Sequence, residues 1–597
     1  MKIFYSAIIA AITLFSVPVQ AQQVSDEVLP EAKTALATKF EFLSPEVAAS
    51  LAAKARGEPI LAKDWMVAVA NPHAAVAGAR VLKEGGTAAD AMVAVQAVLG
   101  LVEPQSSGIG GGAFLVWFDA TTGKLTTLDG RETAPMAVTP RLFQNANGER
   151  IKFWDAVVGG RSVGVPGTPA LMEAAHKRWG QKAWNNLFLE AIDLAESGFA
   201  VSPRLAALIA GDADRLRQFS DTEAYFFQGG KPLVEGSRLT NLEYADVMRR
   251  MADEGARVIY SGDIARAIVD TVRGAKSNPG VITLTDLAIY EVRERPAICV
   301  PFRGHQVCGM GPPSSGALTV GQILGLLDQF PVGPRGNPHT MRLVGDASRL
   351  AFADRGRYMA DSDFVPVPTK GLVSDDYLSE RAKLLTGSTA LTEVVPGNPE
   401  YSHASLWEDD VSLELPSTSH ISIVDSYGNA LSMTTTIENG FGSRLMTNGF
   451  LLNNELTDFS FSSHINGLPI ANRVEPGKRP RSSMSPTIVL KDGLPTLVIG
   501  SPGGSRIIGF VAEAIVSHID WGMNVQAAVS APHAINRFGT FDLEKGTSLE
   551  NMVEPMEALG YKVTLRALNS GLHAISITKD GLAGGADPRR EGIALGQ

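Results

Sequence analysis

A pair of alternating segments in the last third of the chain sets the strongest limit on its fold. Residues 417–425 alternate in the manner of a half-buried strand, and residues 430–437 alternate in the same way. The stretch 426–428 between them fits a three-residue hairpin loop with Gly428 in the left-handed conformation. The sequence therefore predicts an antiparallel β-hairpin here.

The predicted register of this hairpin brings two threonines together. With Gly428 in the left-handed position, Asp425 pairs with Asn429, and Thr418 falls directly opposite Thr436. The two hydroxyls would then share one face of the sheet. A hydroxyl pair of this kind is usually a simple cross-strand hydrogen bond. The alternative, that these hydroxyls take part in catalysis, remains open on this pattern alone.

The composition is that of a globular protein with a large core. The chain has 597 residues, of which 45% are hydrophobic and 19% charged, and this argues against disorder. Its 53 basic and 63 acidic residues give a formal net charge of −10, which argues against a nucleic-acid partner because phosphates call for a basic face. No obvious repeat and no Pro-, Ser- or charge-rich linker divides the sequence.

The N-terminus has the pattern of a secretory signal peptide. Lys2 precedes the apolar stretch 3–17, and residues 19–21 (Val-Gln-Ala) supply the small-residue pattern of a cleavage site. We expect residues 1–21 to be removed, with a buried N-terminal helix as the alternative. No later segment has the length and apolar character of a membrane span. The expected location is the periplasm or the exterior.

The two cysteines of the chain, Cys299 and Cys308, are too few for a disulfide scaffold or a zinc cluster. The segment around them has the pattern of a hairpin, and a two-residue turn at Arg303-Gly304 would place the cysteines directly opposite each other. A disulfide and two free buried thiols both remain open.

Two predicted helices and a glycine-rich stretch occupy residues 73–112. Thr87 is expected to cap the second helix, with Asp90 reaching back to it. The glycines of residues 108–112 lead into a strand-like run instead of following one. A phosphate loop needs the opposite order of strand, glycines and helix. We therefore interpret these glycines as close packing against a sheet and exclude a nucleotide site.

Helical patterns dominate residues 140–400, and strands return from Thr418 onward, which together indicate an α+β layered body. Four polar residues in the helical region share one helical spacing: Asp354, Arg355, Tyr358 and Asp361. They could mark a polar site, but we interpret them as an exposed or ion-paired helix face.

A second glycine pair stands directly before a helix. Gly503 and Gly504 precede an apolar helical run that starts near Ile507, so their backbone N–H groups can converge at a helix N-terminus, where negative charge is favoured. This arrangement suits an oxyanion. A tight turn that needs glycine only for steric reasons is the alternative.

Taken together, several segments closely resemble the γ-glutamyltransferase family of N-terminal nucleophile hydrolases, in the right order and through nearly the whole mature chain. The matching segments are Asp129–Pro135, Pro312–Gly316, Thr418–His420, Asn453–Phe459, Ser482–Pro486 and Ser501–Gly504.

The resemblance implies an α+β fold, the four-layer αββα sandwich, built from two chains after self-cleavage. The bond that breaks is Ser417–Thr418, so residues 22–417 form the large subunit and residues 418–597 the small, catalytic subunit of a heterodimer. Thr418 then acts as the nucleophile, and cleavage frees an α-amine with a reference pKa near ~8 that can assist its own hydroxyl. Thr436 orients the nucleophile, and Gly503 and Gly504 are the oxyanion donors.

The resemblance also assigns the substrate-binding groups. Arg131 corresponds to the residue that grips the α-carboxylate of a γ-glutamyl donor, where a guanidinium can bind bidentately. Ser482 and Ser483 are further donors to that carboxylate. Glu455 and Asp458 correspond to the acceptors for the α-ammonium.

The sequence departs from the family at two places. Glu438 stands where many members carry Asn, so it either adds a third carboxylate around the ammonium or turns away into an ion pair. The stretch 459–478 is short and contains no tyrosine, whereas some members have a longer lid with a tyrosine over the pocket. The acceptor side is therefore expected to be more open.

The expected function is hydrolysis or transfer of γ-glutamyl groups from glutathione and other γ-glutamyl amides. The reaction would pass through a γ-glutamyl ester on Thr418, released to water or to an amino-acid or dipeptide acceptor, without a metal or an organic cofactor. The nearest rival is a glutaryl-type β-lactam (cephalosporin) acylase on the same scaffold. Glu455 and Asp458 argue against it, as does Glu438 if it faces the pocket, because carboxylates without a cation to meet are costly to desolvate. An exported binding protein without turnover is the rival from another class.

Overall fold

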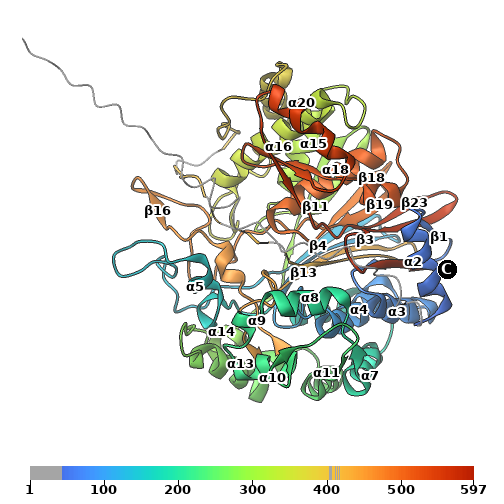
Figure 1. Cartoon of the computed structure of the whole chain (residues 1–597), viewed down its shortest axis with the longest axis vertical. Coiled ribbons are helices and arrows are strands. Elements are labelled where there is room, and N and C mark those ends of the chain that lie inside the picture. The colour runs from blue at the N-terminus through green and yellow to red at the C-terminus, as the bar shows by residue number, and fades with distance from the viewer. Residues whose placement is uncertain (1–39, 41–42, 402–405, 411, 413, 416) are drawn as a thin grey trace, which may run out of the picture.

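Two seven-stranded sheets form the centre of the computed structural model (Figure 1). The described residues are 40, 43–401, 406–410, 412, 414, 415 and 417–597. In spatial order, the first sheet contains β25 (Ile593–Gly596), β2 (Met66–Val69), β12 (Ser419–Val424), β13 (Ala430–Thr436), β3 (Gly112–Asp119), β4 (Lys124–Gly130) and β9 (Arg293–Arg295). The second sheet contains β1 (Ile60–Ala62), β24 (Gly581–Ala586), β23 (His573–Thr578), β19 (Leu494–Gly500), β18 (Thr487–Lys491), β11 (His305–Met310) and β10 (Ala297–Phe302).

Strands from before and after Thr418 are interleaved in both sheets. β12 and β13 pair with each other and lie between β2 and β3. In the second sheet, β24, β23, β19 and β18 lie between β1 and β11. Figure 1 shows this mixing as blue strands beside orange and red ones. Neither part of the chain therefore supplies all the strands of either sheet.

Helices cover the outer face of each sheet. On the first sheet, α3 (Pro72–Lys83) and α4 (Ala88–Val102) pack against β2, β12 and β13. On the second, α15 (Gly316–Asp328) and α18 (Ile507–Ile519) pack against β10, β11 and β19, with α16 (Pro338–Tyr358) against α15. In Figure 1 these two groups of helices lie on opposite sides of the strands. The predicted α+β class is therefore confirmed.

Further helices and short strands surround these layers. The helices are α2 (Pro45–Ala55), α5 (Phe153–Val157), α6 (Thr168–Trp179), α7 (Leu189–Ser197), α8 (Pro203–Gly211), α9 (Ala213–Leu216), α10 (Ser220–Phe226), α11 (Leu242–Glu254), α12 (Arg257–Tyr260), α13 (Gly262–Gly274), α14 (Leu284–Ala288), α17 (Asp375–Ala382), α19 (Val525–Ser530) and α20 (Val553–Ala558). The short strands are β5 (Phe199–Ala200), β6 (Phe227–Gln228), β7 (Lys231–Pro232), β8 (Arg238–Leu239), β14 (Met446–Thr447), β15 (Phe450–Leu451), β16 (His464–Ile465), β17 (Leu468–Pro469), β20 (Ala534–Asn536), β21 (Thr540–Glu544) and β22 (Lys562–Arg566).

The alternation along β13 decides which of its side chains face the layer between the sheets. Leu431 and Met433 belong to the apolar core shared with α3 and α4. Ser432 points the other way, and its Oγ donates a hydrogen bond to the carbonyl oxygen of Ile499 in the second sheet, 3.1 Å away. Because side chains alternate between the two faces of a strand, Thr436 also faces the layer between the sheets.

The two helices, the cap at Thr87 and the close packing of the glycines predicted within residues 73–112 are confirmed. Thr87 caps α4, and its side chain and that of Asp90 form a reciprocal capping box. The glycine-rich stretch leads into β3 and packs closely against the end of β13. A Cβ added at Gly111 would lie 1.9 Å from the carbonyl oxygen of Thr436. These glycines therefore allow the backbone before β3 to approach the end of β13.

The predicted signal peptide, residues 1–21, lies outside the described residues. In the part of the chain that the structure describes, no helix combines the length and the apolar character that crossing a membrane requires.

The hairpin around the two cysteines forms in the predicted register. Cys299 in β10 is paired with Cys308 in β11, and the two-residue turn at Arg303 and Gly304 has positive φ at both residues, 49° and 73°. Of the two possibilities left open by the sequence, the structure contains the disulfide.

We predict that the Cys299→Ser/Cys308→Ser double variant is less stable than the wild type by about 2–3 kcal/mol. The disulfide closes a loop in the unfolded chain and so lowers the conformational entropy of the unfolded state. Urea unfolding under non-reducing conditions measures the difference, with Thr418→Ala in every protein compared so that a cut at Thr418 cannot prevent refolding. The protein that keeps both cysteines, measured in excess reductant, serves as the control and should unfold at the midpoint of the double variant. An unchanged midpoint on reduction would contradict the cross-link.

Candidate active site

The hairpin of β12 and β13 brings Thr418 and Thr436 together as the sequence predicts. Ser419 pairs with Thr435 along the ladder, so Thr418 falls opposite Thr436, and their Oγ1 atoms are 2.9 Å apart. The backbone N–H of Glu438 donates to the Oγ1 of Thr436 at 2.8 Å. This hydrogen bond leaves the hydroxyl proton of Thr436 available for Thr418. The predicted register is therefore confirmed.

The backbone at Thr418 is strained. Its φ is 92°, a conformation that costs a residue with a Cβ about 1–3 kcal/mol unless the surroundings hold it. Two hydrogen bonds hold Thr418 in this conformation. The N–H of Thr418 donates to the carbonyl oxygen of Ser106 at 3.2 Å, and Arg590 Nη1 donates to the carbonyl oxygen of Thr418 at 2.9 Å. On the other side of the peptide bond, Ser417 Oγ donates to the carbonyl oxygen of Gln105 at 2.8 Å. The Ser417–Thr418 bond is thus held from both sides.

A small cavity of about 20 Å³ lies in front of the two threonines. It has room for roughly one water molecule. The lining residues are Arg131, Glu414, Leu415, Thr418, Thr436, Glu438, Glu455, Asp458, Ser482, Ser483, Met484, Gly504 and Ile507. All of the site residues expected from the sequence, with the exception of Gly503, therefore meet at one place.

Arg131 is the buried cation of this cavity. Its guanidinium forms ion pairs with Glu455 and Asp458, the first and last residues of the 3-10 helix η5 (Glu455–Asp458). A carboxylate oxygen of Glu132 lies 3.9 Å from Nη1 of Arg131. Burial alone would lower the pKa of Arg131, but the three carboxylates together raise it above its usual value. Burial raises the pKa of Glu455 and of Asp458 well above the usual range, and the charge of Arg131 opposes this effect. The side chains expected to bind opposite ends of a donor thus bind one another here.

Glu438 faces the same cavity and does not turn away into an ion pair with a described residue. Its Oε1 accepts a hydrogen bond from the backbone N–H of Leu415 at 3.2 Å, and its Oε2 is hydrogen-bonded to the side-chain amide of Asn454. Burial, with the nearby charge of Asp458 next in importance, raises the pKa of Glu438 well above its usual range. The cavity that Arg131 lines therefore also contains the carboxyl groups of Glu438, Glu455 and Asp458.

A further carboxylate lines the cavity and comes from the segment before Thr418. Glu414 is 3% exposed, forms an ion pair with Arg355 and accepts a hydrogen bond from the Oγ of Ser483. Burial would raise its pKa, but Arg355 and Arg481 lower it below the usual value. An ionised carboxylate therefore lies at Ser483, where the sequence predicts donors for a carboxylate.

The glycine pair lies at the start of the helix beneath this segment. Gly503 and Gly504 both have positive φ, 136° and 58°, and η6 (Gly504–Arg506) leads directly into α18. A Cβ added at Gly504 would lie 2.7 Å from the carbonyl oxygen of Glu414, so only glycine lets the chain pass so close. A Cβ at Gly503 would instead meet the ring of Phe510 at 2.8 Å.

Sequence reasoning missed three groups of the site. Of the two alternatives for the helix face of Arg355, exposed or ion-paired, the structure has the ion pair, which Arg355 forms with Glu414. Arg355 is 2% exposed, and its Nε donates to the Oγ of Ser315 at 2.8 Å, but its contact with the site residues was not predicted. Glu414 and Arg590 were not identified at all. The helical spacing around Arg355 did carry a signal, but a spacing pattern alone does not show which face of a helix is buried.

No metal site is apparent in the described stretches, where His, Cys, Asp and Glu do not form a group of three or more that could hold an ion. His420, which lies two residues after Thr418, already uses both ring nitrogens, with the Oγ1 of Thr434 at 2.9 Å and the Oγ of Ser422 at 3.0 Å. Burial lowers its pKa well below the usual value, so it is a neutral support for β12.

A threonine at the start of a central strand, facing a charged pocket between two sheets, is the arrangement of the N-terminal nucleophile hydrolases. Comparison with known proteins narrows this class. The family model for gamma-glutamyltranspeptidase matches residues 74–597, and the chain belongs to the γ-glutamyltranspeptidase family of enzymes.

Relatives of two kinds are similar to the chain. It is 36% identical over 551 residues to the glutathione hydrolase proenzyme of Bacillus subtilis, covering 89% of this chain and 92% of the relative. It is 33% identical over 550 residues to the acylase ACY 1 proenzyme of Pseudomonas sp. strain SE83, covering 90% and 94%. The crystal structure of cephalosporin acylase from Bacillus halodurans superimposes with a TM-score of 0.80 at 27% identity, covering 90% and 97%.

The raised pKa of Glu438 predicts how the stability of the protein depends on pH. The unfolded carboxyl loses its proton near its reference value of 4.5, whereas the folded one keeps it to higher pH. The folded state then binds more protons, so this residue lowers the stability as pH rises above about 4.5. Glu438→Gln removes that contribution.

Thermal unfolding at several pH values between about 5 and about 8 measures this effect. The melting temperature should fall less with rising pH in Glu438→Gln than in the wild type. The exposed Glu554 in α20 gives a matched control, and Glu554→Gln should follow the wild-type curve. Parallel curves for wild type and Glu438→Gln would show that Glu438 ionises normally in the folded protein.

Proposed function

We propose that this protein is a γ-glutamyl hydrolase and transpeptidase, which acts on glutathione and other γ-glutamyl amides through an ester on Thr418. The observation that carries the proposal is the carboxylate of Glu414, which lines the same cavity as Thr418 and is bound by Ser483 and Arg355. Its presence supports a carboxylate-binding position in the cavity of Thr418. The α-carboxylate of a γ-glutamyl donor has the same chemistry.

The charge balance of the cavity favours a donor that also carries an ammonium. Arg131 alone faces Glu455, Asp458 and Glu438 from the same cavity. One guanidinium compensates part of this negative charge, and burial raises the pKa of each of these carboxyl groups. The α-ammonium of a γ-glutamyl group would supply the second cation, which stabilises buried carboxylates.

A glutaryl-type acylase is the second candidate, and the similarity to acylases among both relatives and solved structures supports it. A glutaryl group has the same length as a γ-glutamyl group but lacks the ammonium. It would leave Glu438 and its neighbours without a cation, at the cost of desolvating them. The carboxyl groups in the cavity therefore favour the γ-glutamyl donor.

We propose that the chain matures by cutting itself at Ser417–Thr418, after removal of residues 1–21 on export. The hydroxyl oxygen of Thr418 adds to the carbonyl carbon of Ser417, the C–N bond breaks, and the hydroxyl proton ends on the nitrogen of Thr418. Water then hydrolyses the resulting ester and leaves a carboxylate on Ser417. The positive φ of Thr418 supports this step, since strain in the reactant lowers its barrier.

The mature protein would then be a heterodimer of residues 22–417 and 418–597 in one four-layer αββα sandwich. The order helix, sheet, sheet, helix supports this architecture. The cut frees the end of the large subunit, so Glu414 can leave the cavity and expose Ser483 and Arg355 to a donor.

In turnover, the freed α-amine of Thr418 accepts the proton of its own hydroxyl, and the oxygen attacks the γ-carbonyl carbon of the donor. Thr436 donates a hydrogen bond to the developing alkoxide, and the N–H groups of Gly503 and Gly504 bind the oxyanion, a role worth roughly 3 kcal/mol per donor. The amine of the donor leaves with the proton. Water or an amine acceptor then cleaves the ester and regenerates Thr418.

We predict that purified wild-type protein contains two fragments, with Thr418 at the N-terminus of the smaller. Thr418→Ala should remain a single chain, because it lacks the attacking oxygen, and Thr436→Val should cut more slowly. Denaturing gels and N-terminal sequencing measure the outcome. Ser419→Ala, one residue further along β12, is the matched control and should cut normally. Efficient cutting of Thr418→Ala would contradict the mechanism.

We predict that a γ-glutamyl anilide is a better donor than a glutaryl anilide by several orders of magnitude in kcat/KM, because a site built for a charged group discriminates against the analogue that lacks it. Initial rates with and without a dipeptide acceptor measure this preference. Glu438→Gln should reduce the ratio while still maturing. Similar rates with both anilides would favour the acylase instead.

A further inference from the structure

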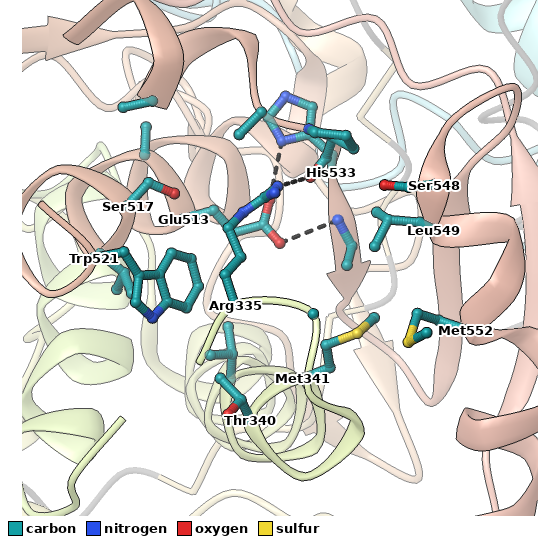
Figure 2. A pocket seen from close by; sticks show the side chains of 18 of the residues that line it. Arg335, Thr340, Met341, Glu513, Ser517, Trp521, His533, Ser548, Leu549 and Met552 are labelled. Atoms are coloured by element: carbon teal, nitrogen blue, oxygen red, sulfur yellow. Dashed lines mark hydrogen bonds and ion pairs between the residues drawn. The ribbon is translucent and has the colours of Figure 1, made fainter. Parts of the chain in front are cut away.

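A second and larger cavity lies at the far end of α18 from the glycine pair. Its volume is about 370 Å³, within the range of about 300–1,000 Å³ that is typical of small-molecule sites. None of its lining residues lines the cavity at Thr418. Figure 2 shows side chains from α16, α18, β20 and the segment 548–552 converging on one space.

The walls of this cavity are mostly apolar. Met341 and Val344 come from α16, Trp521 follows α18, and Leu549 and Met552 close the opposite side. Figure 2 shows Trp521 and Met552 on opposite sides of the open space. An apolar ligand body would replace water against this surface, and each buried CH₂ group contributes about 0.8 kcal/mol.

A chain of hydrogen bonds determines the protonation of the acid in this cavity. Ser570 Oγ donates to Asp587. Burial would raise the pKa of Asp587, but Arg589 and its other partners lower it below the usual value. Because that hydroxyl proton is used, His533 must donate its Nε2–H to Ser570 Oγ, 2.7 Å away. Burial holds the pKa of His533 well below its usual value, so its Nδ1 carries no proton.

It follows that Glu513 is a neutral acid. Its Oε2 lies 2.9 Å from the bare Nδ1 of His533 and must donate the proton, while its Oε1 accepts the N–H of Ala534 at 3.1 Å. Burial raises the pKa of Glu513 to about 8, in agreement with this proton placement. Figure 2 shows these contacts as dashed lines beside the cavity.

Arg335 is then the charged group at this cavity. It is exposed at the rim, its Nη2 donates to the carbonyl oxygen of Pro532 at 2.8 Å, and its guanidinium lies 5.9 Å from the ring centroid of Trp521. Trp521 is fixed by a 3.0 Å hydrogen bond from its Nε1 to the carbonyl oxygen of Gly333. Among the described residues, no carboxylate forms an ion pair with Arg335.

We propose that this cavity binds a small apolar monocarboxylate, with its hydrocarbon body between Met341, Trp521 and Met552 and its carboxylate on Arg335. The net charge of the lining is positive, which complements an anion, and the apolar walls complement an aryl or branched aliphatic group. The neutral acid of Glu513 gives no counter-charge for an amine. This site is separate from the proposed reaction at Thr418.

The test uses 3-phenylpropanoate as the probe, with 3-phenylpropanamide and 3-phenylpropylamine as its uncharged and cationic analogues. Calorimetric titration of the full, purified protein should show saturable binding of the acid. Both analogues should bind at least about tenfold more weakly, which is the loss expected for a charge-assisted hydrogen bond. Absence of binding by the acid at millimolar concentration, or equal or tighter binding of either analogue, would overturn the proposal.

Two variants locate the binding. Arg335→Met keeps the stem and removes the charge, and should weaken binding of the acid about tenfold. Met552→Trp fills the cavity and should abolish binding in a protein that still melts cooperatively. Arg266→Met, an exposed arginine in α13, is the matched control and should bind as the wild type does. Unchanged binding in Arg335→Met or in Met552→Trp would overturn the proposal.

Discussion

The pairing of β12 with β13 is the constraint on which the site depends. A slip of one residue would turn every side chain of β12 to the opposite face, and Thr418 would then point toward α4. The turn prevents this slip. Asp425 accepts hydrogen bonds from the backbone N–H groups of Tyr427 and Asn429 and from that of Ala88 at the start of α4. The same carboxylate therefore closes the hairpin and ties it to the helix layer.

The features that could be predicted from the sequence are those that neighbouring residues determine. The hairpin register, the capping box at Thr87 and the pairing of Cys299 with Cys308 each depend on a few adjacent residues and on turn geometry. The gathering of Arg131 and Asp458 came instead from resemblance to a family. Their direct ion pair could not be predicted, because it joins residues that are distant in the sequence, and because each was expected to bind substrate.

The groups that sequence reasoning missed share one property. Glu414, Arg355 and Arg590 act across contacts between segments far apart in the chain, such as the hydrogen bond from Arg590 to the carbonyl oxygen of Thr418. A buried arginine on a helix looks the same in a sequence as an exposed one until its partner is known. The ion pairs and hydrogen bonds between distant segments of this site therefore could be identified only from the three-dimensional structure.

The interleaved strands have a consequence for the lifetime of the cut protein that we propose. In the first sheet, β12 and β13 lie between β2 and β3, and in the second sheet β1 and β11 flank the strands that follow Thr418. Two chains that share both sheets in this way cannot separate unless the hydrogen bonds between strands break in both. Folding would therefore have to precede the proposed cut. Once unfolded, the two pieces would have to find each other by diffusion, and refolding would depend on concentration. The lifetime of the mature protein would then be governed by its unfolding rate and not by a reversible equilibrium.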